Sequence, residues 1–206
     1  MSEFSHQKSL TTLLQEVRAC TICKPFLPLG CNPILQLHSD AKILLVGQAP
    51  GKRAHESNTP FNDPSGDRLR TWLGVDRDTF YDPHKIALLP MGFCYPGTGE
   101  NGDLPPRPEC AEQWRETLLA QLPHIQLTIV IGQYARDWHF PEQKKLPLSD
   151  LVKNWQLFWP ERIVVPHPSP RNMRWFRNHP WFENEIVPML QAQVIISFPY
   201  NLKTLS

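Results

Sequence analysis

The sequence predicts an α/β fold, a three-layer α/β/α sandwich in which helices cover both faces of a central four-stranded parallel sheet. Four short apolar runs each end in loop signals, and segments with helical patterning lie between them. The chain has 206 residues, which suits a single domain. We expect this domain to span residues 1–206, with its core at about 10–190 and a C-terminal tail at 192–206.

The strands are predicted from apolar runs that are continuous rather than alternating. The first, Lys42–Gly47 (KILLVG), ends at glycine, as a strand buried on both faces does. Three later runs have the same character. The predicted strands are Lys42–Gly47, Ile86–Leu89, Leu127–Gly132 and Arg162–Pro166. In such a sheet ligands bind at the carboxyl ends of the strands.

Helices are predicted from apolar spacing and from residues typical of helix ends. Leu10, Leu13 and Val17 recur at helical spacing, and another segment begins with Pro108 and Glu109. The predicted helices are Ser9–Ala19, Gly66–Leu73, Pro108–Leu122, Gly132–Trp138 and Asn172–Leu190, the last interrupted by Pro180. Val194–Phe198, in the tail, is a candidate edge strand.

The composition limits the classes of function. The net charge of +1 means that any nucleic-acid contact must come from a local basic patch. The N-terminus lacks a secretory apolar segment, and no apolar run approaches a membrane span. We therefore expect a cytoplasmic protein that contacts no membrane. We also expect a monomer. In that compartment the 5 cysteines are more often metal ligands or free thiols than disulfides.

Three loops carry residues suited to chemistry. Gly47-Gln-Ala-Pro-Gly51 follows the first strand and can point backbone amides at a ligand, although a plain strand-exit turn is equally compatible. In Pro60–Gly66, Phe61 is placed to stack on a flat heterocycle or to fill the core. In His167–Asn172 two prolines restrict the backbone around His167, which suits a catalytic or a structural histidine.

Together these loops resemble the uracil-DNA glycosylase superfamily, whose members share a glycine-proline loop after the first strand and a His-Pro-Ser segment after the last. The most similar pattern is that of the iron–sulfur enzymes, called family four, with some likeness to family five in Asp63–Asp67. Phe61 and Gly66 follow Gly47 by fourteen and nineteen residues, which is the spacing in that family. The resemblance spans roughly residues 10 to 190 and implies a base-excision repair enzyme whose partner is DNA.

The cysteines extend the resemblance. Cys20-x-x-Cys23 has the spacing of a metal chelate, and Cys94 and Cys110 are sixteen positions apart. The iron–sulfur glycosylases arrange four cluster ligands in this way. The resemblance therefore implies a 4Fe-4S cluster on these four cysteines and leaves Cys31 without a counterpart. A structural zinc ion is the rival metal, and unrelated buried thiols are the remaining interpretation.

The resemblance also implies roles for the loop residues. His167 would donate a hydrogen bond to the leaving base, and a carboxylate, with Asp63 as first candidate, would orient water. The rival carboxylates are Glu56 and Asp67, and a turn residue before Pro64 is an equal interpretation of Asp63. The candidate catalytic residues are His167, Asp63 and Gln48, and the candidate base-binding residues are Gly47, Ala49, Pro50, Gly51, Phe61 and Pro90.

Three positions depart from the family pattern. Family-one enzymes have a water-orienting aspartate where this chain has Ala49, and family four has glutamate where this chain has Gln48. Pro90 occupies the position of an asparagine that reads the uracil edge, and proline offers no side-chain donor or acceptor. Two alternatives therefore stay open: excision of another deaminated base, or a DNA- or nucleotide-binding module of the same fold without excision activity.

The segment after His167 is basic and aromatic. Three arginines recur at three-residue spacing, so a helix would align them on one side. Such a segment suits a wedge that fills the gap left by a flipped nucleotide, or a solvated helix whose aromatic residues dock into the core. The candidate DNA-binding residues are Ser169, Arg171, Asn172, Arg174, Trp175 and Arg177.

Overall fold

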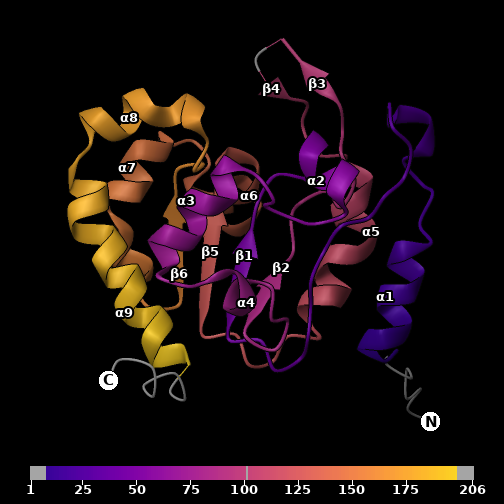
Figure 1. Cartoon of the computed structure of the whole chain (residues 1–206), viewed down its shortest axis with the longest axis horizontal. Coiled ribbons are helices and arrows are strands. Elements are labelled where there is room, and N and C mark those ends of the chain that lie inside the picture. Colours follow the sequence, from indigo (N-terminus) through magenta and orange to yellow (C-terminus); the bar gives the residue numbers. More distant parts are fainter. Residues whose placement is uncertain (1–7, 101, 199–206) are drawn as a thin grey trace.

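The computed structural model of the protein describes residues 8–100 and 102–198. A sheet of four parallel strands lies at its centre, in the order β2-β1-β5-β6 (Figure 1). The strands are β1 (Ile43–Val46), β2 (Ile86–Leu88), β5 (Leu127–Ile131) and β6 (Arg162–Val165). Each predicted apolar run forms one strand, and the predicted fold class is confirmed.

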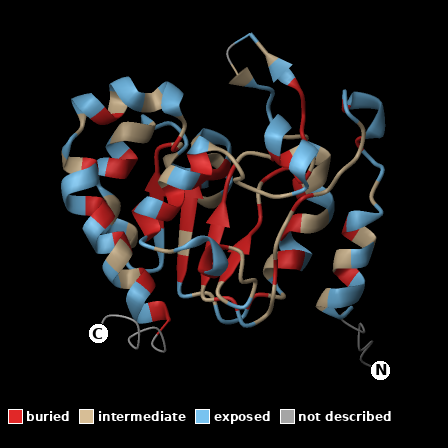
Figure 2. Ribbon diagram, in the orientation of Figure 1, coloured by how far each residue is buried: buried red, intermediate tan, exposed pale blue. Residues whose placement is uncertain are grey.

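The sheet is the most deeply buried part of the molecule (Figure 2). Every residue of β1 and β2 is buried, as are the last three residues of β6. β1 and β5 pair in parallel with Ile43 opposite Leu127. Because both faces of the sheet are covered, neither face of a strand can be polar, which explains the continuous apolar runs.

Helices form the two outer layers. α3 (Pro64–Leu73) lies in the connection from β1 to β2. The connections from β2 to β5 and from β5 to β6 run across the sheet in the opposite direction, and they contain α5 (Pro108–Leu119), α6 (Gln133–His139) and α7 (Leu148–Lys153). Right-handed crossovers place these two groups on opposite faces. α1 (Leu10–Arg18) packs against α5.

Shorter elements occupy the connections. A two-stranded antiparallel hairpin, absent from the sequence prediction, rises above the sheet between β2 and α5 (Figure 1). It consists of β3 (Thr98–Gly99) and β4 (Gly102–Asp103). The remaining short helices are α2 (Lys52–Ser57), α4 (Arg77–Phe80) and the 3-10 turns Lys24–Phe26, Pro141–Gln143, Trp155–Phe158 and Pro170–Asn172.

The C-terminal segment differs from the prediction in one respect. As expected, helix is interrupted near Pro180, between α8 (Met173–Asn178) and a π-helical turn at Phe182–Ile186 that continues into α9 (Val187–Ser197). The predicted edge strand at Val194–Phe198 is wrong.

The cause of this error is a tertiary contact. Val187, Leu190 and Val194 recur at helical spacing and are buried, and α9 packs against α3. This packing overrides the strand preference of the β-branched residues. The predicted tail therefore begins as helix, and its residues 199–206 lie outside the described part of the chain.

The fold gathers the predicted loops at one edge of the sheet. Gly47–Gly51 follows β1, Pro90 follows β2 and His167 follows β6, and all three strands are parallel. Within residues 8–100 and 102–198, no helix combines the length and the apolar character that crossing a membrane requires.

Candidate functional site

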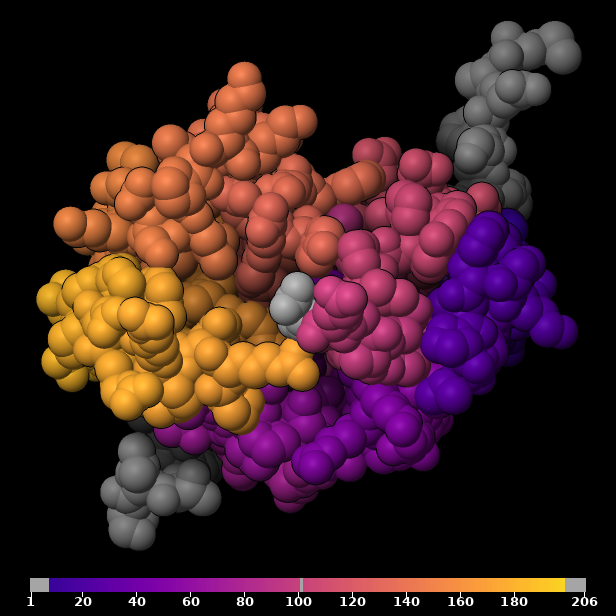
Figure 3. Space-filling view, turned by 90° about the horizontal axis from the view of Figure 1, so that it is seen from above, coloured from indigo at the N-terminus to yellow at the C-terminus, as the bar shows by residue number. Residues whose placement is uncertain are grey.

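Two adjoining cavities open at the carboxyl ends of the strands, an inner one of about 100 Å³ and an outer cleft of about 460 Å³. Figure 3 looks down on this edge, where the segment after β6, the β3–β4 hairpin and the loop after β1 meet. The inner cavity is lined by every predicted catalytic and base-binding residue: Gly47, Gln48, Ala49, Pro50, Gly51, Phe61, Asp63, Pro90 and His167. The expectation that the first loop and the His167 segment share one cleft is confirmed.

His167 is held in one orientation by its own loop. Its Nδ1 accepts a hydrogen bond of 3.2 Å from the Ser169 amide, and its carbonyl accepts one of 2.7 Å from the Asn172 side chain. Burial lowers the pKa of His167, and the charge of Asp63 acts in the opposite direction. The imidazole is therefore neutral at pH 7. Since Nδ1 is an acceptor, the proton resides on Nε2, which can donate.

Phe61 lies against the first loop in a constrained backbone conformation. Its φ of 52° falls in the left-handed region, which is uncommon for a bulky side chain and is often found at functional sites. Arg70 donates a hydrogen bond of 3.3 Å to the Phe61 carbonyl. The Phe61 ring meets Phe80 edge-on, with the ring centroids 6.0 Å apart.

Gly66 makes this arrangement of Phe61 possible. A β-carbon at position 66 would lie 1.8 Å from the Phe61 carbonyl oxygen, whereas one at position 47 would lie 3.6 Å from the tip of the Phe61 ring. Gly66→Ala is therefore expected to displace the Phe61 loop and to lower the melting temperature, while Gly47→Ala leaves the melting temperature close to that of the wild type. Thermal unfolding of the two variants checks this, and equal stability would contradict the constraint.

Gln48 has a structural contact that its sequence position did not reveal. Its Nε2 donates to the carbonyl of Leu104 at 2.7 Å and to that of Asp103 at 3.3 Å, both in or beside the β3–β4 hairpin. The side chain thus joins the first loop to the hairpin.

Pro90 is positioned by a buried arginine. Arg115 of α5 donates to the carbonyls of Leu89 and Pro90 at 3.3 and 3.1 Å, and its Nη2 lies 2.7 Å from Nε2 of His139. Burial lowers the pKa of Arg115 to about 10 and that of His139 to about 3. A neutral His139 accepts the hydrogen bond. The sequence offered no signal for Arg115, which resembles any cation on a helix until its burial is known.

The candidate carboxylates have different environments. Asp63 lines both cavities and caps α3, because its Oδ1 accepts a hydrogen bond of 2.9 Å from the Gly66 amide. Glu56 pairs with Lys52 at 3.8 Å and Asp67 pairs with Arg70 at 2.5 Å, and neither lines these cavities.

Asp103 is a carboxylate that the sequence analysis missed. It lies in β4 and lines both cavities. Burial raises its pKa, while the charge of Arg171 and a hydrogen bond from Thr98 lower it. The motif comparison could not find Asp103, because it follows none of the four long strands.

The outer cleft has polar and basic walls. Among the predicted DNA-binding residues, Ser169, Arg171 and Asn172 line it, and Arg53 of α2 adds a cation that the sequence analysis did not select.

The other predicted DNA-binding residues lie in α8, beyond the cleft. Arg174 and Arg177 are exposed. Trp175, by contrast, is half-buried, donates a hydrogen bond of 2.7 Å to Ser149 and stacks on His179 with the ring centroids 4.3 Å apart. This placement favours the interpretation that the aromatic residues dock into the core.

All five cysteines line a third cavity, beside α1 and α5. Burial raises the pKa of Cys94 to about 11 and that of Cys110 to about 12, so metal binding here would require the loss of these protons. Cys31 lines the same cavity as the other four. The structure thus brings the predicted ligands together and does not separate Cys31 from them.

The spacing of the sulfur atoms bears on the kind of metal. A single zinc ion with Zn–S bonds of about 2.3 Å requires sulfur atoms about 3.8 Å apart. Within the described residues, no three cysteine sulfurs lie within 4.8 Å of one another.

Comparisons with known proteins give a family match and a similar solved structure. The sequence model of the uracil DNA glycosylase superfamily matches residues 36–191, a range that contains the first loop and the His167 segment. Among solved structures, the chain is similar to a solution NMR structure of a candidate uracil DNA glycosylase from Methanosarcina acetivorans. The two share 17% sequence identity at a TM-score of 0.48, over 78% of this chain and 97% of that chain.

Proposed function

The chain belongs to the uracil DNA glycosylase superfamily, and from this premise we propose that it hydrolyses the N-glycosidic bond of uracil or another deaminated base flipped out of DNA. One observation carries the proposal. The neutral imidazole of His167 shares a cavity with Phe61 and with the amides of the first loop, at the edge of the sheet where ligands bind.

Each of these groups has a distinct task. The flipped base stacks on Phe61, and the backbone amides around Gln48 and Ala49 hold one carbonyl of the base. As the C1′–N bond breaks, the electron pair leaves with the base. Nε2–H of His167 donates to the oxygen on which this negative charge accumulates. A neutral donor suffices, because the hydrogen bond strengthens as the charge develops.

The choice of base depends on backbone groups. Pro90 offers no side-chain donor to a base edge, so the loop amides and the cavity shape must supply the discrimination. Uracil, hypoxanthine and xanthine all carry a carbonyl that can accept the bond from His167. We propose that the substrate is one of these deaminated bases.

The alternative is a DNA- or nucleotide-binding module without excision activity, which Ala49, Gln48 and Pro90 favour. Oligonucleotides that each contain one altered base separate the two functions, in single- and double-stranded form. A glycosylase leaves an alkali-labile abasic site in at least one of them. A binding module retards the DNA and leaves every strand intact after alkali.

We further propose that Cys20, Cys23, Cys94 and Cys110 hold a 4Fe-4S cluster. The proposal is supported by the convergence of the four thiols in one cavity, where Cys23 is buried and the other three are partly buried. The cluster supplies a structural cross-link, since its ligands come from the loop after α1, the segment after β2 and the start of α5. None of the steps at the base requires it.

The exposed arginines of α8 are expected to contact phosphates. Replacing Arg174 and Arg177 by alanine should lower DNA affinity about equally for all sequences. It should also reduce the slope of log Kobs against log salt concentration by about 1.8, because each phosphate contact contributes about 0.9. Fluorescence anisotropy over a range of salt concentrations measures this slope. Arg77→Ala is the control, because Arg77 is exposed and lines neither cavity. An unchanged slope in the double variant would place the DNA elsewhere.

A further inference from the structure

Asp103 projects from the β3–β4 hairpin toward the first loop. A β-carbon at Gly51 would lie 3.3 Å from Oδ2 of Asp103, so this carboxylate lies directly against the loop that lines the base cavity. Asp103 is exposed in the free protein and lines both the inner cavity and the outer cleft. It therefore faces both the cavity proposed for the base and the cleft proposed for the DNA.

The hairpin that carries Asp103 is held at three points. Gln48 donates to the carbonyls of Asp103 and Leu104, and the Leu104 amide donates to Gly97 at 2.8 Å. On the other side a β-carbon at Gly102 would lie 2.5 Å from Nη1 of Arg171, so the arginine packs directly on the hairpin backbone. These contacts fix the carboxylate between the first loop and the segment after His167.

We infer that Asp103 is the catalytic carboxylate of this protein, which orients the attacking water and accepts its proton. The inference rests on the proposed function. The C1′–N bond breaks and its electron pair leaves with the base, which His167 stabilises. The water oxygen bonds to C1′ of the sugar, and the proton that this water loses passes to Asp103. The released base then takes a proton from solvent.

This arrangement explains why position 48 is a glutamine. Its amide nitrogen donates to two hairpin carbonyls, and a glutamate at this position would place a carboxylate against the same carbonyls without a proton to share. A glutamate at position 48 and these two hydrogen bonds to the hairpin thus exclude each other. In this chain Gln48 binds the hairpin, position 49 is an alanine, and the carboxylate, Asp103, lies on the hairpin rather than on the first loop.

Asp63 is less suited to accept the proton. One of its oxygens is already engaged as the cap of α3, where it accepts a hydrogen bond of 2.9 Å from the Gly66 amide. Burial raises the pKa of Asp103, as does the charge of Asp63, although Arg171 and Thr98 oppose this effect. A raised pKa makes a carboxylate a stronger base.

The test compares Asp103→Asn with Glu100→Gln, a charge removal on the same hairpin at a residue that lines neither cavity. Single-turnover excision should slow by about 10²-fold or more in Asp103→Asn, which is the usual contribution of a general base. It should stay at the wild-type rate in Glu100→Gln. DNA affinity and melting temperature should be unchanged in both.

The pH profile and a double variant provide two further readouts. The excision rate of the wild type should fall at acidic pH as Asp103 is protonated, and Asp103→Asn should lose this acid limb of the pH–rate profile. The titratable and polar groups that face Asp103 are Arg171, Asp63, Thr98 and His167. Gln48→Ala should slow excision through the hairpin, and its effect should be largely absent when added to Asp103→Asn, because the two act as a unit.

The outcomes are distinguishable. If the wild type releases no base, the proposed function is wrong. If the wild type is active and Asp103→Asn keeps its rate and its acid limb while Asp63→Asn loses both, the inference about Asp103 is overturned and Asp63 is the base.

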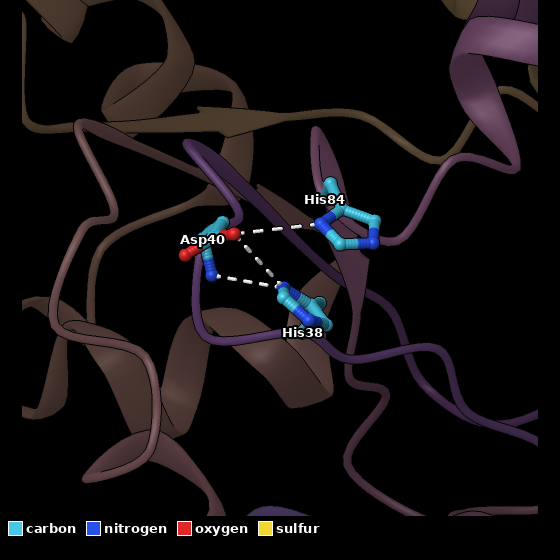
Figure 4. Close-up of side chains that lie close together, drawn as sticks. All are labelled: His38, Asp40 and His84. Carbon is cyan, nitrogen blue, oxygen red and sulfur yellow. Dashed lines mark hydrogen bonds and ion pairs between the residues drawn. The ribbon is translucent and has the colours of Figure 1, made fainter.

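A second, independent inference concerns the opposite end of the sheet. His38 and Asp40 lie in the segment that leads into β1, and His84 lies in the segment that leads into β2, the neighbouring strand (Figure 4). The Lys42 amide donates to the Lys85 carbonyl at 3.0 Å and joins the two segments. The rings of His38 and His84 lie with their centroids 3.7 Å apart and their planes tilted by 34°.

The two carboxylate–imidazole pairs of this cluster have the spacing of donor atoms in a zinc site. Oδ2 of Asp40 lies 3.5 Å from Nδ1 of His38 and 3.4 Å from Nδ1 of His84. A tetrahedral zinc ion with bonds of about 2.0–2.1 Å requires donor atoms about 3.3–3.4 Å apart. One donor from each of the three residues lies within 4.8 Å of the other two.

We propose that His38, Asp40 and His84 bind a divalent transition-metal ion of the zinc class. Two imidazoles and one carboxylate favour zinc over magnesium or calcium, which prefer oxygen ligands alone. The side chains of Asp40 and His84 are 59% and 58% exposed, so water completes the coordination. The metal displaces the Asp40 amide, which donates to Nδ1 of His38 at 3.2 Å. The ion would cross-link the segments before β1 and β2.

Calorimetric titration of the cluster-loaded, full-length protein with zinc tests this site. The wild type should bind one zinc ion that His84→Ala and Asp40→Asn do not bind, and zinc should raise the melting temperature of the wild type alone. His124→Ala, at another exposed histidine, should bind as the wild type does. Equal zinc binding by His84→Ala and the wild type would overturn the proposal, as would the absence of binding by the wild type.

Discussion

Replacing His167 by alanine is expected to slow single-turnover base release by about 10²–10³-fold, the usual effect of losing one donor to a developing negative charge. The reason is that Nδ1 of His167 is engaged by the Ser169 amide, so Nε2 carries the proton that the leaving base requires. DNA affinity should change little, because phosphate contacts supply most of it. Rapid-quench kinetics with enzyme in excess measure the effect.

Phe61→Ala is the matched comparison for His167→Ala. It should weaken capture of the flipped base by about 1–3 kcal/mol of stacking and leave the subsequent bond cleavage less affected. Because burial lowers the pKa of His167, protonation of this residue should impair excision only below its ordinary range near 6.5. Excision by His167→Ala at the wild-type rate would remove His167 from the chemistry.

The second large effect is expected at the cysteines. Cys94→Ser and Cys110→Ser should lose the cluster, with a fall in iron from about four atoms per chain to near zero and loss of the brown colour. The melting temperature should fall as well, because the proposed cluster would join the loop after α1, the segment after β2 and the start of α5. Iron analysis and absorption spectra of protein purified without oxygen measure this loss.

Cys31→Ser is the control for the cluster. Cys31 lines the same cavity but has no counterpart in the iron–sulfur spacing, so iron content should be unchanged. Equal iron loss in Cys31→Ser and Cys94→Ser would show that the ligand set is different. Zinc in place of iron in the wild type would identify the rival metal.

The sheet was predictable because each strand is buried on both faces, and this burial leaves a continuous apolar run in the sequence. The loops at its carboxyl edge were predictable for the same reason, since the strand ends locate them. Val194–Phe198 was not, because its β-branched residues resemble a strand until the packing of α9 on α3 is known.

The part of the site that escaped prediction depends on distant contacts. Gln48 and the carbonyls to which it donates are 55 and 56 residues apart, and no local pattern joins them. Asp103 lies in a strand of two residues, which is too short to show a periodic hydrophobic pattern in the sequence. Trp175 was grouped with the arginines of its segment, although its contacts with Ser149 and His179 lead into the core.

The most direct measurement of the central claim is the product balance of one reaction. An oligonucleotide containing a single deaminated base is incubated with excess protein, and mass spectrometry quantifies the free base and the abasic strand. For at least one of uracil, hypoxanthine and xanthine, we expect the two products in equal amounts, with both suppressed in His167→Ala. Intact strands and no free base for all three, despite retained DNA binding, would contradict the glycosylase assignment and leave the binding module.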